Sequence, residues 1–416
     1  MKVGIHCTPS PGVFPLKGLM VVYVNRLIQA HLTTIMKTDK TKFPGTFRYI
    51  SLGDIHLGHR TTPTSHILLN LDKVITDKML KELDMVIITG DLFDRQLNYG
   101  DESVHQINRW ATTFMMRCAA NNVMLRIVEG TPSHDREQTQ FFVEQKVNVN
   151  IPVDLHYSKT LSIEYIEKLD AHFLYVPDKW HPSTAVTLSQ VKEQMASLGI
   201  EKVDFAIMHG AFSYQLPSIV EEPTHDEEEY LALVKHQILI GHVHNMTIND
   251  RIYAAGSFDR ICHGDEIDKG LFHFIVREDG NFTATFIKNK NAKKYVTLEV
   301  HGYDTKQLLN KVKETLAELP KYSAIRLRCD PMDVANGDIE TFRVEYPNYE
   351  WSVLVEKATK KKNSVATSLK EFDMSKFIAI TPETISDLLK EEISKVTDDQ
   401  TIQVRCLERL AQFVRN

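Results

Sequence analysis

Five short polar motifs, each placed after an apolar segment, contain the residue types that bind metal ions and transfer protons. In chain order they are Asp54-x-His56, Gly90-Asp91-Leu92-Phe93-Asp94, Ser133-His134-Asp135, His209-Gly210 and Gly241-His242-Val243-His244. Imidazole and carboxylate groups together are ligands for Mn, Fe or Zn ions rather than for an all-oxygen calcium cage. The motifs therefore predict chemistry that a metal ion assists.

The spacing within the motifs favours more than one cation. Asp54 and His56 are two residues apart, so an extended backbone would place both side chains on one side. The same holds for His242 and His244, although a loop could direct them toward two different ions. A carboxylate such as Asp91 has two oxygens and can bridge two cations. Two cations about 3.5–4 Å apart can activate a bridging hydroxide and hold a phosphoryl group for in-line attack.

The elements that must position these motifs alternate along the chain. Apolar runs predict strands, and apolar residues at helical spacing predict helices between them. The expected strands are 47–52, 84–89, 124–128, 172–176, 203–208 and 236–240, and the expected helices lie near 67–75 and 102–120. Strands that alternate with helices predict an α/β domain. Polar residues at strand ends stand where open α/β sheets place their sites.

Composition excludes several classes of protein. The chain has 416 residues, of which 43% are hydrophobic and 25% charged, which is typical of a globular protein with two or three domains. The formal charge of −6 gives no global basic field for nucleic acid. Five scattered cysteines without a CxxC pair argue against a disulfide scaffold and a thiolate zinc site, and fit a reducing cytoplasm. No apolar stretch reaches the ~20 residues of a membrane span.

Changes in the residue pattern divide the chain into segments. Residues 1–45 are interpreted as an N-terminal extension whose order the pattern leaves open. After about residue 290 a smaller α/β unit is expected, with strands at 295–300, 324–327 and 351–355, a helix around Leu308–Leu316, and a further strand at Ile339–Val344. Residues 358–380 read as a linker that contains three consecutive lysines. Residues 381–416 carry two amphipathic helical stripes.

The ordered motif set resembles the calcineurin-like metallophosphoesterases. Within that family, Asp-Ile-His-Leu-Gly and Gly-Asp-Leu-Phe-Asp resemble the SbcD-type DNA double-strand-break repair nuclease subunits of bacteria, archaea and phages, including the phage recombination branch. The segment Gly256-Ser257 … Arg260 … Glu266 … Lys269-Gly270 is also similar to that branch. The resemblance covers residues 46–290 and implies a four-layer α/β/β/α sandwich. It further implies a smaller capping and DNA-binding domain over 291–357 and a helical partner-binding tail over 381–416.

The resemblance also implies a role for each motif residue. Two divalent cations, with Mn²⁺ the expected ion, would share the bridging Asp91. Asp54, His56 and His244 would hold the first cation, and His209 and His242 the second. His134 would sit beside the scissile phosphate, and Asp94 would face the substrate. A helix-capping carboxylate is the alternative interpretation of Asp94.

One position departs from the family pattern. The family has Gly-Asn-His followed by Asp or Glu, with the asparagine oxygen on the second cation, whereas this chain reads Gly130-Thr131-Pro132-Ser133-His134-Asp135. Ser133 is assigned to the asparagine place. Because a hydroxyl is shorter and a poorer neutral ligand, we expect weak affinity for the second cation.

Charge along the chain suggests where partners bind. Basic residues outnumber acidic ones between residues 288 and 362, and Lys288, Lys290, Lys293 and Lys294 cluster at the junction of the two units. The functional interpretation is a surface that engages DNA phosphates, and the alternative is an ordinary solubilising surface. The acidic run from Glu221 to Glu229 is interpreted as a solvated loop that points away from the site or gates it.

Three function classes follow from these residues. The leading hypothesis is a DNA exonuclease or endonuclease subunit, a homodimer that works with an SMC-like ATPase of the SbcC type in recombination, repair or replication. The resemblance implies the ATPase partner, and ATP would bind to that partner because this sequence contains no nucleotide-binding P-loop motif. The alternatives are a phosphatase or nucleotide phosphodiesterase, suggested by Arg95 after Asp94, and a non-catalytic DNA-binding subunit with a degraded second metal site.

Overall fold

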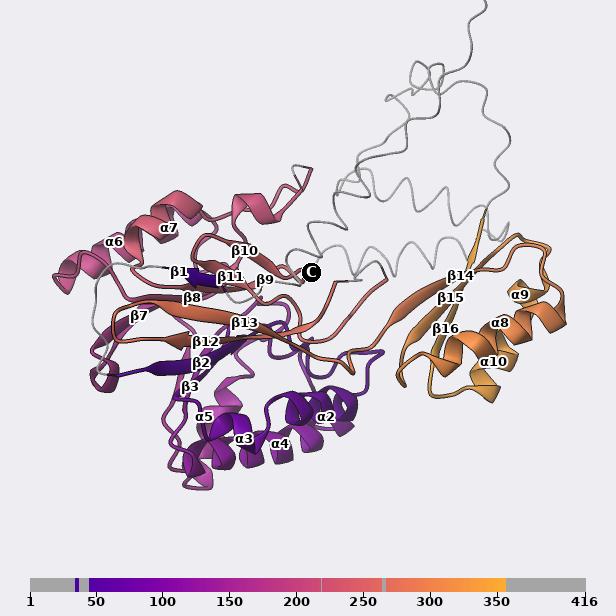
Figure 1. The fold of residues 1–416 in the computed structure, drawn as a ribbon, viewed down its shortest axis with the longest axis horizontal. Coiled ribbons are helices and arrows are strands. Elements are labelled where there is room, and N and C mark those ends of the chain that lie inside the picture. The colour runs from indigo at the N-terminus through magenta and orange to yellow at the C-terminus, as the bar shows by residue number, and fades with distance from the viewer. Residues whose placement is uncertain (1–33, 37–44, 218, 264–266, 357–416) are drawn as a thin grey trace, which may run out of the picture. The chain divides into compact units, whose positions relative to one another are not determined.

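The computed structural model describes residues 34–36, 45–217, 219–263 and 267–356. The described chain is mixed α/β, with parallel and antiparallel strands in three sheets (Figure 1). The predicted linker 358–380, the predicted tail 381–416 and Glu266 lie outside the described residues, as does most of the predicted extension 1–45. Of that extension, the strand β1 (Thr34–Met36) pairs antiparallel with β13.

The largest sheet has seven strands in the order β1-β13-β12-β2-β3-β4-β5. Its strands after β1 are β2 (Phe47–Leu52), β3 (Met85–Ile88), β4 (Met124–Val128), β5 (Leu155–Ser158), β12 (Gly270–Val276) and β13 (Phe282–Lys288). The strands β2, β3, β4 and β5 are mutually parallel, and β12 closes against β2 in antiparallel register. The carboxyl ends of β2, β3 and β4 therefore meet at one edge of this sheet.

The second sheet has six strands in the order β10-β11-β9-β8-β7-β6. Its strands are β6 (Ser162–Ile166), β7 (Ala171–Val176), β8 (Phe205–Gly210), β9 (Ile238–His242), β10 (Thr247–Asn249) and β11 (Ile252–Ala254). The strands β7, β8 and β9 run parallel. This sheet therefore also has one edge at which parallel strands end.

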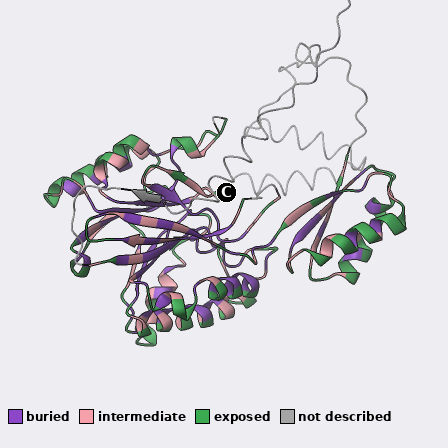
Figure 2. Ribbon diagram, viewed as in Figure 1, coloured by how far each residue is buried: buried purple, intermediate pink, exposed green. Residues whose placement is uncertain are grey.

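One buried core lies between these two sheets, because side chains of both contribute to it. Phe47, Tyr49 and Phe274 come from the larger sheet, and Phe173 and Phe205 from the smaller. Their rings pack at close range, as in the 4.7 Å separation of the Tyr49 and Phe274 centroids. Burial of large aromatic side chains is a main favourable term in folding. Figure 2 shows the strands largely buried and the outer helix faces exposed.

Helices cover the outer faces of the two sheets. The helices α2 (Thr64–Val74), α3 (Asp77–Leu80), α4 (Glu102–Ala120) and α5 (Gln140–Asn148) bury apolar residues in a core that includes residues of β2, β3 and β4. The helices α6 (Thr184–Ser197) and α7 (Glu227–Leu233) do the same against the smaller sheet. Figure 1 shows the two sets on opposite sides. Two short 3-10 turns, η1 (Glu167–Leu169) and η2 (Ser213–Gln215), complete this part.

The small third sheet follows in sequence, and its strands β14 (Tyr295–Glu299), β15 (Ala324–Cys329) and β16 (Glu350–Val355) are parallel. The helices α8 (Thr305–Ala317), α9 (Val334–Gly337) and α10 (Ile339–Glu345) share a core with it. The sequence prediction of strands at 295–300, 324–327 and 351–355 and of a helix around Leu308–Leu316 is confirmed.

The prediction of a strand at Ile339–Val344 is wrong, because this segment is the helix α10. The strands β15 and β16 are parallel neighbours, and a parallel pair needs a crossover connection, usually a helix. Ile339, Phe342 and Tyr346 recur at helical spacing; Phe342 is buried in the core of this unit, and the partly buried Ile339 and Tyr346 pack against it. This helical spacing is the signal in the sequence that distinguishes α10 from a strand.

Candidate metal centre

The motif residues meet at the carboxyl ends of five strands. Asp54 and His56 follow β2, Asp91 follows β3, and His134 lies in the loop after β4. His209 is the next-to-last residue of β8, His242 is the last residue of β9, and His244 comes two residues later. Because β2, β3 and β4 belong to one sheet and β8 and β9 to the other, the site joins both sheets.

Three groups of motif side chains place ligand atoms within 4.8 Å of one another. They are Asp54–His56–His244, His56–Asp91–His134 and Asp91–His209–His242. Asp91 belongs to two of the groups, and so does His56. A carboxylate with this placement can share its two oxygens between neighbouring cations.

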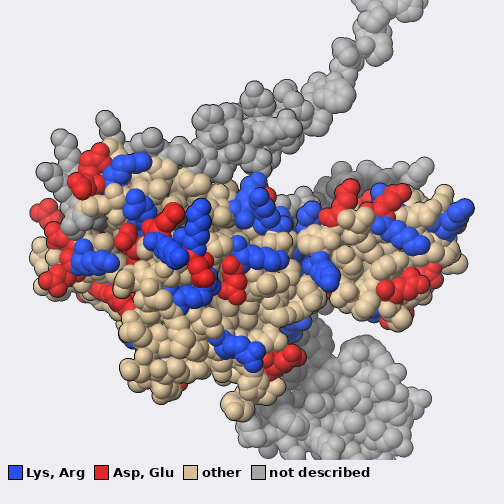
Figure 3. Space-filling view, turned by 60° about the horizontal axis from the view of Figure 1, so that its bottom comes forward, with Lys and Arg blue, Asp and Glu red and all other residues tan. Residues whose placement is uncertain are grey.

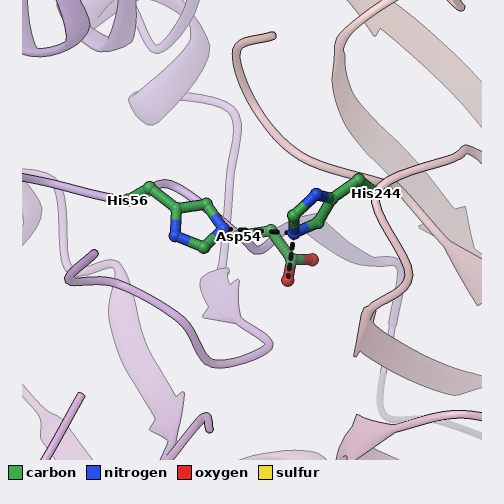
Figure 4. Close-up of side chains that lie close together, drawn as sticks. All are labelled: Asp54, His56 and His244. Carbon is green, nitrogen blue, oxygen red and sulfur yellow. Dashed lines mark hydrogen bonds and ion pairs between the residues drawn. The ribbon is translucent and has the colours of Figure 1, made fainter. Parts of the chain in front are cut away.

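Figure 4 shows the first group, in which the rings of His56 and His244 converge beside the Asp54 carboxylate. The Nε2 atoms of the two histidines are 3.2 Å apart, and Asp54 Oδ1 lies 3.9 Å from His244 Nε2. Both Asp54 oxygens also accept a hydrogen bond from the backbone N–H of His242. Asp54 thereby ties the end of β2 to the end of β9.

The backbone at this site is strained in the way that functional sites often are. Asp54, His56, Asp91 and His242 all have positive φ, with values of 48°, 54°, 46° and 106°. Non-glycine residues rarely adopt this region, and each instance costs on the order of 1–3 kcal/mol. Four such residues among the proposed ligands mean that the surrounding fold holds the side chains in position against their local preference.

Glycine permits the close approach of the strands on which the ligands stand. A Cβ added at Gly130 would lie 2.1 Å from the backbone nitrogen of Asp91, and one at Gly90 would lie 2.3 Å from His209 Nδ1. Neither neighbour is the end of a flexible side chain. Glycine at these two positions is therefore required for Asp91 and His209 to come together.

Neighbouring acceptors lie close to the outer nitrogen of three of the histidine rings. His209 Nδ1 donates to the backbone oxygen of Thr89 at 2.6 Å, which leaves Nε2 facing Asp91 at 3.4 Å. His242 Nε2 lies 3.4 Å from Glu222 Oε2, and His56 Nδ1 lies 3.4 Å from Asp94 Oδ1. In metal sites the outer ring nitrogen of a ligating histidine is usually held this way.

Asp91 and the histidines around it stabilise one another's charged forms. Burial acts to raise the pKa of Asp91, but the charge of His209 and hydrogen bonds from His134 and His209 hold that pKa well below its usual range. Burial likewise acts to lower the pKa of His209, but Asp91 raises it to about 10. The proton on His209 Nε2 faces the same carboxylate that a cation would contact. A divalent cation would therefore displace it, and metal affinity should fall in acid.

His134 lies at the rim of the site beside Asp91, whereas Asp94 lies beside His56. His134 is about one third exposed at the rim of the site, and its Nδ1 lies 2.9 Å from Asp91 Oδ2. That hydrogen bond raises the pKa of His134. Asp94 faces His56, and the next helix begins only at Glu102, so the capping interpretation of Asp94 does not apply.

The structure does not bring Ser133 into the site. Ser133 is exposed, whereas Thr131 is buried and its hydroxyl lies 3.2 Å from Asp91 Oδ2, 3.3 Å from His209 Nε2 and 3.4 Å from His242 Nδ1. Ser133 was assigned to the position of the family's asparagine because it directly precedes His134. Thr131 instead directly follows Gly130, as the asparagine does in the family pattern. Thr131 is the residue that lies in the site, because Pro132 and Ser133 loop outward.

Sequence reasoning missed three further residues near the centre. Glu222, interpreted as part of a solvated acidic run, lies against His242, while Asp226 of the same run caps α7. Asp178 is close enough to His209 and His242 to sense their charges, and burial raises its pKa. Lys269 is fully buried and donates to the backbone oxygen of His244. An acidic residue inside an acidic run carries no signal that separates it from its neighbours.

The four predicted DNA-binding lysines do not share one environment. Lys290 and Lys294 are exposed, and Lys288 pairs with Asp268. Lys293 is instead buried, with its Nζ 2.7 Å from Glu350 Oε2, 3.3 Å from Thr61 Oγ1 and over the ring of Tyr295. Lys293 therefore belongs to the packing of the chain. On the face that Figure 3 shows, basic and acidic side chains are intermingled.

The donor set fits a transition-metal pair. It combines two carboxylates with four imidazoles whose inward nitrogens face each other, which suits Mn, Fe or Zn. Ligand atoms at about 2.0–2.2 Å from a tetrahedral cation lie roughly 3.3–3.6 Å from one another. The distances that link Asp91, His209 and Thr131 agree with that spacing.

Comparison with known proteins adds nothing to the site. No protein-family model matches the chain, and no curated protein matches it. The crystal structure of TT1561 of Thermus thermophilus is similar with a TM-score of 0.32 and 10% identity over 51% of this chain and 90% of that one. Another crystal structure has a TM-score of 0.34 and 8% identity over 58% of this chain and 99% of that one. Within the described residues, no helix has the length and apolar character needed to cross a membrane.

Proposed function

We propose that this protein is a metal-dependent phosphodiesterase that hydrolyses DNA. The observation that carries the proposal is the Asp91 carboxylate, which stands between two sets of ligands contributed by the ends of five strands. We further propose that the fold is the four-layer sandwich of the calcineurin-like metallophosphoesterases, in its SbcD-type branch. Residues 291–357 would then form the capping domain.

The chain's own residues divide the work of such a reaction. Asp54, His56, His244, Asp91, His209 and His242 would hold two divalent cations, with Mn²⁺ the expected ion. When bound, the cation pair supplies an activated water and neutralises charge on the phosphoryl group. The electrostatic stabilisation of a transition state is usually the largest catalytic contribution, and it requires groups fixed in advance. In this site the fold holds several ligand residues in a rarely adopted backbone conformation, and a hydrogen bond to Thr89 orients the ring of His209, so these groups are fixed in advance.

We propose that His134 assists the leaving group. It is partly exposed at the rim, and its contact with Asp91 favours the protonated ring. A protonated His134 can stabilise charge on the phosphate or give its proton to the departing oxygen. Its ring lies 5.1 Å from that of His56, so it reaches the same space as the first group of ligands.

DNA is the substrate we propose. Lys290 and Lys294 are exposed and close in sequence to the small third sheet, where they can contact backbone phosphates. The wider proposal is a homodimer that works with an SMC-like ATPase in the cytoplasm of a bacterium or a phage-infected cell. The predicted partner-binding segment 381–416 lies outside the described residues.

A Mn²⁺-dependent nuclease assay on linear duplex DNA tests the proposal. We expect cleavage that rises with Mn²⁺ and stops on chelation, with a loss of about a hundredfold or more in His134→Ala. His105→Ala is the matched control, because His105 is exposed on α4 and outside the three ligand groups. An absence of cleavage at every Mn²⁺ concentration, with and without the ATPase, would falsify the proposal.

The two alternatives receive less support. The arginine that suggested a phosphatase, Arg95, pairs with Asp101 at 3.2 Å. The non-catalytic alternative rested on Ser133, which is exposed, while Thr131 places a hydroxyl among the ligands. Rapid turnover of a small phosphomonoester by a protein that leaves DNA intact would favour the phosphatase.

A further inference from the structure

The buried hydroxyl of Thr131 lies beside three of the proposed ligands of the second cation. Its Oγ1 lies 3.2–3.4 Å from one atom each of Asp91, His209 and His242. Those three residues already form one of the groups that could hold a cation. Thr131 Oγ1 is therefore a fourth donor atom facing the same point.

We infer that Thr131, and not Ser133, supplies the neutral oxygen ligand of the second cation. Because a hydroxyl is a weaker ligand than an amide oxygen, the second cation is the more weakly held of the two. This inference rests on the proposed function. It adds a residue to the site that neither the motif pattern nor the assignment of Ser133 identifies.

The tautomers of the two histidines favour this arrangement. His209 donates from Nδ1 to Thr89, and His242 presents Nε2 to the Glu222 carboxylate. In the neutral rings, the lone pairs then lie on His209 Nε2 and His242 Nδ1. These are the two nitrogens nearest to Thr131 Oγ1. Both lone pairs thus face the point that the threonine hydroxyl also faces.

The backbone holds Thr131 in this position. Its N–H donates to Asp91 Oδ1 at 2.6 Å, and the preceding Gly130 donates to Asp135 Oδ2 at 2.8 Å. Asp135 is fully buried and also accepts from the N–H of Phe93, so it fixes the loop after β4 to the loop after β3. The threonine hydroxyl is therefore placed before any cation binds.

The chemistry of a hydroxyl explains why the second site should be weaker. A threonine oxygen carries neither a negative charge nor the strong carbonyl dipole of an amide. The first group of ligands contains one carboxylate and two imidazoles, apart from Asp91. We therefore expect Mn²⁺ titration to show one tight and one weak ion, with Thr131 controlling only the weak one.

A valine exchange at Thr131 and a matched control at Ser133 test the inference. We expect Thr131→Val to weaken the second Mn²⁺ by about ten- to hundredfold and leave the first unchanged. Ser133→Ala should change neither affinity. Calorimetry and the electron paramagnetic resonance of bound Mn²⁺ report both ions without any activity measurement, and thermal unfolding reports whether the variant folds.

A cysteine exchange identifies a direct ligand. Because cadmium prefers thiolate, Thr131→Cys with Cd²⁺ should give an ultraviolet charge-transfer band between sulfur and metal, and Ser133→Cys should give none. If wild-type protein binds no Mn²⁺, the proposed function fails. If it binds two ions but the band appears with Ser133→Cys, or with neither variant, only the role of Thr131 is overturned.

Discussion

The Nε2 atoms of His56 and His244 lie 3.2 Å apart, although 188 residues separate the two histidines in the chain. Two imidazole nitrogens at this distance share a single proton or a single cation between them. A cation between the two rings would bind both nitrogens at once, and Asp54 Oδ1, 3.9 Å from His244 Nε2, would be a further donor.

Removal of His244 should weaken the first cation and spare the second. In His244→Gln we expect the affinity of the tighter Mn²⁺ to fall about tenfold or more, because one of its two imidazole ligands is lost. Calorimetric titration measures this, and the stabilisation of wild-type protein by Mn²⁺ in thermal unfolding should shrink with it. His105→Gln is the control, and equal losses in both variants would contradict the assignment.

Asp94 should act on the metal through His56. We expect Asp94→Ala to lower the affinity for the first cation by about tenfold, with Asp94→Asn in between, because the outer nitrogen of His56 loses its carboxylate. If Asp94 instead faces the substrate, metal affinity will stay constant and KM will rise. Mn²⁺ titration and steady-state kinetics on the same variants separate the two roles.

Glu222 should support His242 in the same manner. The contact of 3.4 Å between Glu222 Oε2 and His242 Nε2 predicts that Glu222→Gln weakens the second cation while the first stays bound. Glu221→Gln is a matched control, because the neighbouring Glu221 is exposed. An unchanged second affinity in Glu222→Gln would show that the carboxylate does not orient the ring.

The junction lysines should separate into two classes. We expect Lys290→Ala and Lys294→Ala to weaken DNA binding and to reduce its salt dependence by about one unit of slope each, because each exposed cation releases a counterion. Lys293→Met should leave DNA affinity unchanged and instead lower the free energy of unfolding by about 1–3 kcal/mol, because the buried Lys293 ammonium loses its contacts with Glu350 and Thr61. Fluorescence anisotropy across salt concentrations and urea unfolding measure the two effects.

His225 should make the protein sensitive to acid. Burial lowers the pKa of His225 from 6.5 to about 4, and its Nδ1 has no hydrogen-bond partner among the residues that the structure describes. Since the unfolded chain binds this proton more readily, the stability it contributes is complete above about pH 6.5 and is lost as the pH falls toward 4. Between pH 7 and 5 this amounts to about 2 kcal/mol.

The test of this effect is the variant His225→Phe in metal-free protein. Its free energy of unfolding should change less between pH 7 and 5 than that of wild type, by about the amount stated. His273→Phe offers a comparison, because His273 is less buried and its pKa is also lowered by burial. An identical pH dependence in His225→Phe and wild type would show that His225 does not titrate in this range.

Residue patterns along the chain were enough to predict the mixed α/β class, most strands and the strand-end positions of the metal motifs. Local patterns carry this information, because burial on one face of a strand or helix leaves a period of apolar residues. The strand 47–52 is confirmed to the residue, and His242 and His244 stand where β9 ends. The segment 339–344 failed because a short apolar pattern fits both periods, and the parallel partners β15 and β16 decided the outcome.

The packing of the folded chain determines which oxygen and which carboxylate face the metal ligands. Ser133 and Thr131 are two residues apart, and nothing local shows that the loop turns Ser133 outward and Thr131 toward Asp91. Glu222 is one of several acidic residues in its run, and only packing brings it to His242. Lys293 reads like its exposed neighbours but is buried against Glu350. Contacts between residues distant in the chain depend on how sheets and loops pack, and residue spacing along the sequence does not encode that packing.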